Sequence, residues 1–177
     1  MEKAKSPWSL PVVVEDIPET GLHIEVEAPV EVRPQLAELA GLRSLPRISG
    51  TFDLVREGTG VRVAGRVNAR VGQTCVVTLE PIESDLDEPV DLVFAPAAAS
   101  DTPNHGSADG KASDKDPPEP LLDGQVDLGA VATEFLLLGI DPYPRKAGVQ
   151  FGALKSDDDS ARPFGALEAL KKRMGDG

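Results

Sequence analysis

The chain has 177 residues, which is room for one domain with tails. Apolar residues make up 40% of it but aromatic residues only 4%, so a core must be built from Val, Leu, Ile and Ala. No apolar run approaches the roughly 20 residues of a membrane-spanning helix, which excludes a helical membrane protein. The single cysteine, Cys75, excludes an internal disulfide and is typical of a reducing compartment.

The formal net charge of −12 is unevenly distributed. Residues 29–75 hold seven arginines against four acids, and residues 143–177 hold seven basic against five acidic residues. Residues 76–142 sum to −13. The total argues against nucleic acid, because phosphate contacts supply much of that affinity, but the two basic blocks leave the partner open.

The first residues do not resemble an export signal. A secretory signal needs a continuous apolar stretch of about 7–15 residues. Here a run of three valines is preceded by Pro7 and Pro11 and followed by acids. We therefore expect a cytoplasmic protein.

Two strands and a short helix are predicted near the N-terminus. Ser9 to Val14 and Leu22 to Glu27 are expected strands, and in the second every other residue is apolar, as in a half-buried strand. Glu31 to Leu42 has apolar residues at helical spacing, with Gly41 near its end.

The clearest pattern is a β-hairpin. Ile48 to Arg56 and Val61 to Val71 are joined by residues 57–60, whose two glycines supply the positive φ angles of a tight turn. The second arm places small apolar residues on one face. The other face carries three arginines, here called the arginine row: Arg62, Arg66 and Arg70.

A short extended piece from Gln73 to Leu79 is followed by a further predicted strand, Ile82 to Phe94. One of its faces carries acids, here called the acidic row: Glu83, Asp85, Asp87 and Asp91. Pro89 within this strand indicates a sheet edge or a bulge.

Residues 97–120 lack apolar periodicity and are rich in Ala, Ser, Asp, Gly and Pro, which predicts a disordered acidic insertion. The residues Val126-Asp127-Leu128 open a predicted helix that runs to Ile140, with Asp127 as its N-cap. We place one domain at residues 1–154 and a flexible linker with a basic tail at 155–177. The fold expected is α+β, with a curved, barrel-like antiparallel sheet of about five or six strands. Two helices would pack on the sheet, and a short helix would lie in the C-terminal tail.

The sequence gives little support for a catalytic role. The only histidines, His23 and His105, stand in no nucleophilic motif, and no phosphate loop or HExxH motif is present. Cys75 begins C-V-V-T and lacks the partners of a zinc site, so it is predicted to be a buried apolar residue. We expect no enzyme, no metal and no cofactor.

The arginine row has two interpretations. Arginines on one strand face could track a phosphate backbone. Alternatively, if the two long strands lie side by side, the arginine row and the acidic row pair across the sheet. Five further basic residues could dock on RNA or form solvated helix ends: Arg145, Lys146, Lys171, Lys172 and Arg173.

Three stretches resemble the YceD family of large ribosomal RNA subunit accumulation proteins, in the style of its alphaproteobacterial members. They read GRVNARVGQTCVVTLEPIESDLDEPVDLVFAP, VDLGAVATEFLLLGIDPYPRK and PFGALEALKK, and the resemblance spans about residues 8–173. Many relatives carry C-x-R-C where this chain has Cys75 to Thr78, so a metal or redox role of that pair is not carried over. The resemblance implies a role in ribosome biogenesis and supplies no catalytic residues.

Three functions follow as hypotheses. An accessory factor would bind large-subunit rRNA or a pre-ribosomal particle through the basic residues named above. An acidic protein-binding module would escort a basic ribosomal protein without touching RNA. A nuclease would need a divalent metal at Asp85, Asp87 and Asp91, which a solvated strand face explains better.

Overall fold

A computed structural model of the chain describes residues 6–96 and 118–149. The chain divides into two units, Met1–Lys146 and Ala147–Gly177, and every described helix and strand belongs to the first. The predicted boundary between residues 154 and 155, the C-terminal tail helix and Lys171, Lys172 and Arg173 lie outside the described residues.

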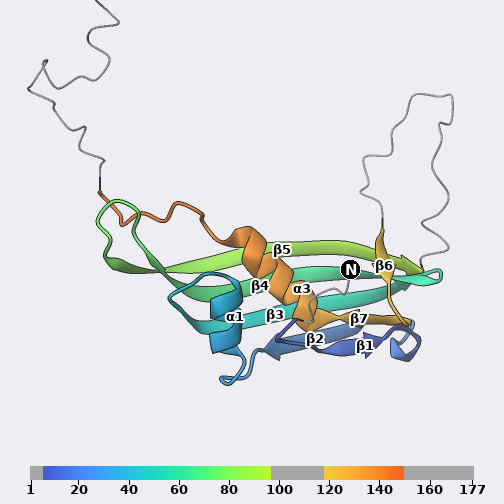
Figure 1. Ribbon diagram of the computed structural model, residues 1–177. Helices are drawn as coiled ribbons and strands as arrows, with labels where there is room; N and C mark the ends of the chain where they lie inside the picture. The colour runs from blue at the N-terminus through green and yellow to red at the C-terminus, as the bar shows by residue number, and fades with distance from the viewer. Residues whose placement is uncertain (1–5, 97–117, 150–177) are drawn as a thin grey trace, which may run out of the picture. The chain divides into compact units, whose positions relative to one another are not determined.

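The main sheet has five strands in the order β2-β3-β4-β5-β6 (Figure 1). Their bounds are β2 Leu22–Glu27, β3 Ser44–Glu57, β4 Gly60–Thr74, β5 Pro81–Pro96 and β6 Glu119–Leu121. Strands β2 to β5 are antiparallel neighbours, whereas β6 runs parallel to β5. The prediction of a purely antiparallel, barrel-like sheet was therefore wrong. Chain order equals strand order, so β2 and β6 lie at opposite edges and the sheet stays open.

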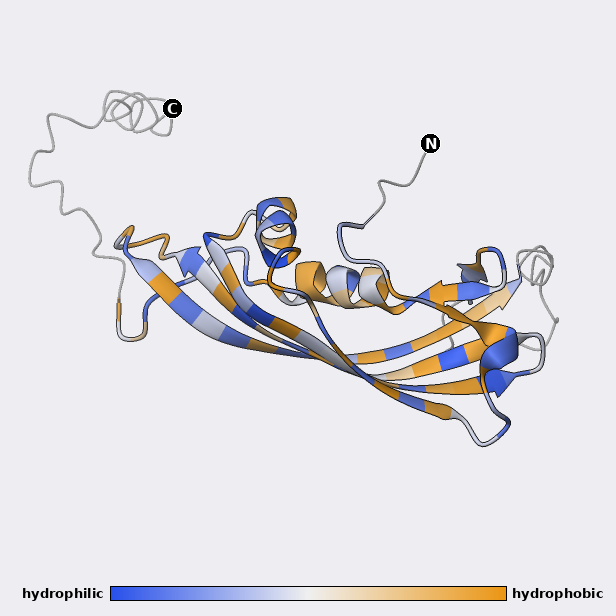
Figure 2. Ribbon diagram, turned by 90° about the horizontal axis from the view of Figure 1, so that it is seen from below, coloured by the Kyte–Doolittle hydropathy of each residue, from blue (hydrophilic) through white to orange (hydrophobic). Residues whose placement is uncertain are grey.

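The remaining elements cover one face of this sheet (Figure 2). They are β1 Pro11–Val13, the 3-10 turn η1 Val14–Asp16, α1 Arg33–Leu39, β7 Gln125–Asp127 and α3 Leu128–Gly139. Strands β1 and β7 form a separate two-stranded antiparallel sheet. Helix α1 packs beside β3, and α3 crosses β4 and β5. The two helices predicted on the sheet are thus present.

The core lies between the sheet and these covering elements. Alternation along the strands sends Phe52, Leu54, Val63 and Val67 inward, and all four are fully buried. Leu36 of α1 and Leu136 of α3 join the same cluster, as do Trp8 and Ile17 from the N-terminal segment. The opposite face of the sheet carries no covering element among the described residues, and its polar side chains face solvent.

Most predicted elements are found, with shifted ends. Strand β2 has the bounds predicted for it. In the hairpin turn Gly58 has a φ of 61°, whereas the positive φ predicted for Gly60 is not found. The extended piece predicted from Gln73 to Leu79 was wrong, because β4 ends at Thr74 and a turn follows. The predicted insertion also ran too far: β6 begins at Glu119, and residues 97–117 lie outside the described residues. No described helix has the length and apolar character to cross a membrane.

Candidate binding surface

The arginine row lies on the uncovered face of β4, because the alternating residues Val61, Val63 and Val67 are buried on the other face. In the register of β4 and β5, Arg62 stands opposite Val93 and Arg70 opposite Asp85. The acidic row of β5 therefore shares this face with the arginine row. The sequence could place each row on a strand face, but only the register shows that the two rows are neighbours.

Two of the arginines bind carboxylates in a bidentate manner. Arg62 donates from Nε and Nη2 to the two carboxylate oxygens of Asp91 at 2.8 and 2.7 Å. Arg66 donates in the same way to Asp87, also at 2.8 and 2.7 Å. Asn68 donates a further hydrogen bond to Asp87 at 2.9 Å. Each pair is diagonal across the strands, within reach of a long side chain.

The remaining arginines of this face are also paired. Arg70 lies 3.0 Å from a carboxylate oxygen of Glu83 and 3.6 Å from one of Asp85. Arg47 of β3 lies 3.7 Å from Glu27 of β2. The described part of this sheet face therefore offers no arginine without a carboxylate neighbour.

The pairing favours the charged form of the three arginines and of Asp87. Hydrogen bonds donated to the carboxylates of Asp91, Asp87 and Glu83 raise the pKa values of Arg62, Arg66 and Arg70. Arg66 in turn lowers the pKa of Asp87. All these groups are about half exposed, so salt screens their attraction. The cross-sheet pairing considered as the alternative to phosphate binding is the arrangement found.

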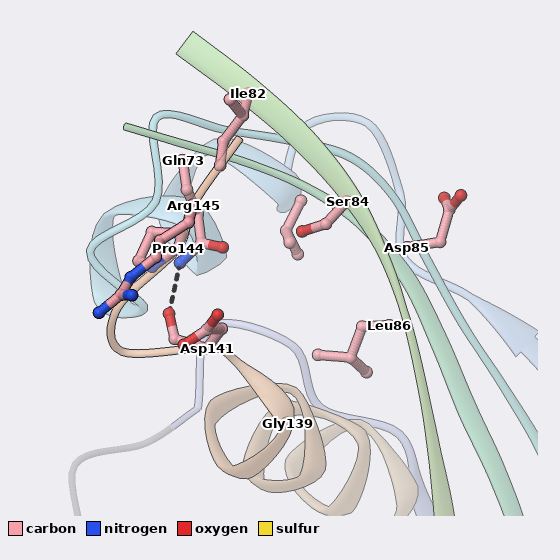
Figure 3. A pocket seen from close by; sticks show the side chains of 10 residues that line it. Gln73, Ile82, Ser84, Asp85, Leu86, Gly139, Asp141, Pro144 and Arg145 are labelled. Atoms are coloured by element: carbon pink, nitrogen blue, oxygen red, sulfur yellow. Dashed lines mark hydrogen bonds between the residues drawn. The ribbon is translucent and has the colours of Figure 1, made fainter. Parts of the chain in front are cut away.

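The basic residues Arg145 and Lys146, which follow α3, have different surroundings. Lys146 places Nζ 2.9 Å from a carboxylate oxygen of Glu80, which raises the pKa of Lys146 and lowers that of Glu80. Arg145 is exposed and makes no ion pair with a described residue. Its side chain lies beside a hollow between the ends of β4, β5 and α3 (Figure 3).

This hollow is small, about 180 Å³, below the roughly 300–1,000 Å³ of ligand pockets. Ile82 and Leu86 form apolar parts of its wall, and Gln73 donates a hydrogen bond to the carbonyl oxygen of Asp141 at 2.9 Å (Figure 3). That bond ties the end of α3 to β4. The hollow lies where these elements meet, and it is too small for a substrate.

Cys75 is fully buried, as the sequence predicted. Its sulfur accepts backbone N–H groups from Thr78 and Lys146, each at 3.4 Å. A hydrogen bond from the Thr78 side chain, followed by these backbone N–H groups, lowers the pKa of Cys75 to about 6. The contacts hold the turn after β4 against residues 143–146, where Val76 also donates to the carbonyl oxygen of Pro144.

The acids proposed for a metal-dependent nuclease are spread along β5. Asp87 and Asp91 bind Arg66 and Arg62, and Asp85 lies near Arg70. Within residues 6–96 and 118–149, no three His, Cys, Asp or Glu side chains are grouped so that they could hold a metal ion.

The sequence predicted an edge or a bulge in β5 at Pro89. Only three of its residues pair with β6, so most of its outer edge lacks a strand partner among the described residues. Pro89 was a signal for this edge. The register of β4 and β5 shows no shift at Pro89, so the edge interpretation holds and the bulge does not.

Comparison with known proteins gives one match. The family model described as large ribosomal RNA subunit accumulation protein YceD matches residues 63–171, which is more than half of the chain. The matched range contains most of β4, all of β5 and α3, and therefore the arginine row except Arg62 and the whole acidic row. Searches of curated proteins and of solved structures found no significant match.

Proposed function

Because the chain belongs to the YceD family of large ribosomal RNA subunit accumulation proteins, we propose that it promotes accumulation of that rRNA by binding a basic ribosomal protein. The protein would act in the cytoplasm as an acidic escort. It would shield the positive charge of its partner until the partner reaches rRNA. This role needs no catalytic step.

The observation that carries the proposal is the pairing of the arginine row. A phosphate backbone approaching Arg62 or Arg66 would have to displace a bidentate carboxylate. The displaced carboxylate would then lie beside a polyanion, which repels it. Direct RNA binding through this face is therefore disfavoured.

The acidic middle of the chain supports a basic partner. Residues 76–142 sum to −13, and β5 alone carries acids on both of its faces. A net excess of one sign raises the association rate of an oppositely charged partner and disfavours partners of like charge. A protein rich in Lys and Arg fits this surface, whereas RNA does not.

Capture from cell extract, with and without nuclease, tests the proposal. We expect identified basic proteins of the large subunit to stay bound to the full chain after RNA is digested, and to be released as salt increases. Loss of every ribosomal protein on digestion would contradict the proposal. A variant with Asp85→Asn and Glu88→Gln should capture less than a matched control with Glu15→Gln and Asp16→Asn.

Direct RNA contact is the second candidate, and the exposed Arg145, which has no ion pair with a described residue, favours it. Under our proposal, changing Arg62, Arg66 and Arg70 to Ala leaves RNA affinity unchanged. A weaker affinity, with a salt slope reduced by roughly 0.7–0.9 for each phosphate that is no longer bound, would favour the RNA-binding role. Arg145→Ala, measured in the same assay, tests the second candidate on its own.

A further inference from the structure

We propose that the outer edge of β5 binds an extended basic peptide of a partner protein as an added strand. The peptide would alternate basic and apolar residues. This inference rests on the proposed function, because it names the surface and the segment through which a basic partner is held.

The edge is long and open. Strand β5 runs over 16 residues, but β6 pairs only with Phe94, Ala95 and Pro96. From Pro81 to Val93, no described residue pairs with the side of β5 that faces away from β4. Figure 1 shows this strand along the border of the sheet, with β6 at one end only. Such an edge is a template for another strand.

The backbone of this edge can be oriented residue by residue. Residues of a strand direct their N–H and C=O groups alternately to the two sides. Cys75 donates to the carbonyl oxygen of Glu80, so even-numbered residues face β4. Pro89, which has no N–H, agrees with this because it occupies an outward position. Four outward N–H groups therefore belong to the acidic row: Glu83, Asp85, Asp87 and Asp91.

The negative charge of the acidic row favours a basic strand at this edge over a second copy of the chain. A second copy pairing antiparallel through β5 would bring the acidic rows together, which destabilises a sheet. A strand with Lys or Arg at alternate positions would instead place cations beside these carboxylates. Asp85 is the most available of them, because its side chain is 80% exposed and 3.6 Å from Arg70, which binds Glu83 more closely. An ionised carboxylate also accepts several hydrogen bonds at once.

The other face of the edge is mostly apolar, with one acid, Glu88, beside Gly139. Leu86 lies on the opposite side of β5 from Asp85 (Figure 3), and it neighbours the last turn of α3. A Cβ atom on Gly139 would lie 2.8 Å from Leu86, which shows how closely the helix approaches β5. On the same turn, Leu137 is 44% exposed and Leu138 is 70% exposed. Apolar residues of an added strand would meet Ile82 and Leu92, which are half-buried on this face of β5, whereas Leu86 is already buried.

Peptide binding to the full chain tests the inference. The probe is a labelled peptide that alternates Lys and Val, measured by fluorescence anisotropy at about 0.15 M salt. Asp85→Ala removes a charge but keeps the outward N–H group, whereas Asp85→Pro removes both. We expect Asp85→Pro to bind roughly tenfold more weakly than Asp85→Ala, since a backbone hydrogen bond can no longer form. Equal affinities would overturn the inference.

Hydrogen exchange of the unaltered chain gives a second readout, which decides the matter if Asp85→Pro fails to fold. The peptide should slow exchange of the outward amides of Glu83, Asp85, Asp87 and Asp91. The amides of Ser84 and Leu86, which face β4, should change little. Unchanged exchange with bound peptide would overturn the inference. Outward amides already protected in the free chain would do so too, and dependence on protein concentration would then identify a second copy as the occupant.

Failure of this inference differs from failure of the proposed function. If Asp85→Pro captures large-subunit proteins as well as Asp85→Ala does, the β5 edge is not the docking site and the escort role stands. If the unaltered chain captures none after nuclease treatment, the escort role fails. The peptide and exchange measurements still decide whether the edge binds a basic strand.

Discussion

At the scale of single residues, the charges of the sheet are arranged in local pairs. Arg66 and Asp87 illustrate this, because their bidentate contact depends on the register of two strands that the turn after Thr74 connects. Alternation in the sequence gives the face of each residue. It does not give the offset between strands, so the sequence left pairing and phosphate binding open as alternatives.

A double-mutant cycle on Arg66 and Asp87 tests the pairing. We expect Arg66→Ala and Asp87→Ala each to lower the free energy of unfolding, and the double variant to cost less than the sum. The coupling should shrink as salt rises to about 1 M, where the screening length falls to about 3 Å. Arg43→Ala with Glu119→Ala serves as a control pair that should be additive. Additivity for Arg66 and Asp87 would contradict the pairing.

His23 provides a prediction on pH. Its Nδ1 lies 2.6 Å from a carboxylate oxygen of Asp53, and this hydrogen bond is the main reason that the pKa of His23 is raised above 6.5, with Glu25 adding to it. Protonation therefore favours the folded state. The gain is complete below the unfolded pKa and is lost as pH rises through the folded pKa.

NMR titration of the His23 ring, assigned with a His105→Gln variant, should show the raised pKa. Asp53→Asn should return it toward its ordinary value, while Glu25→Gln should lower it less, because Glu25 lies farther from the ring at 3.8 Å. An ordinary pKa in the unaltered chain would rule out the pair.

At the scale of elements, sequence patterns predicted the strands and turns whose structure depends on neighbouring residues in the chain. The alternation of Leu22 to Glu27 and the glycines of the hairpin turn identified β2, β3 and β4, because a half-buried strand and a tight turn each have a short-range signal. Strand β6 escaped prediction, since three residues containing Pro120 are too few to show a period. Its parallel pairing depends on where the chain returns after residue 117, which no local pattern records.

Asp127 links two elements through one side chain. Its Oδ1 accepts N–H groups from Gly129 and Ala130 at the start of α3, and from Leu10 in the N-terminal segment at 2.7 Å. Asp127→Ala should lower the free energy of unfolding by about 1–2 kcal/mol, the usual cost of losing such a cap. Asp127→Asn keeps an acceptor oxygen and should cost less. Urea unfolding of both variants measures the difference, and equal losses would show that the cap is not the cause.

At the scale of the first unit, the two sheets differ in how much pairing holds them. Strand β4 is paired on both sides over nearly its whole length, whereas β1 and β7 have three residues each and pair with one another, apart from one bridge between Gln125 of β7 and Leu122. A central strand opens only when its neighbours also separate, while a short two-stranded sheet can open locally. The β1–β7 sheet is joined to the core through Val126 and the nearby Trp8. Opening of this sheet therefore exposes apolar surface, which costs free energy.

Native-state hydrogen exchange should therefore separate the two sheets. We expect the amides of β4 to exchange last, at the free energy of global unfolding, and those of β1 and β7 to exchange earlier through local opening. Adding a low concentration of urea should speed β4 far more than β1 or β7, because global unfolding exposes more surface than local opening. Equal rates and equal urea dependence in both sheets would mean that the unit opens as a whole. The small sheet would then be as firmly held as the long hairpin, despite its few backbone pairs.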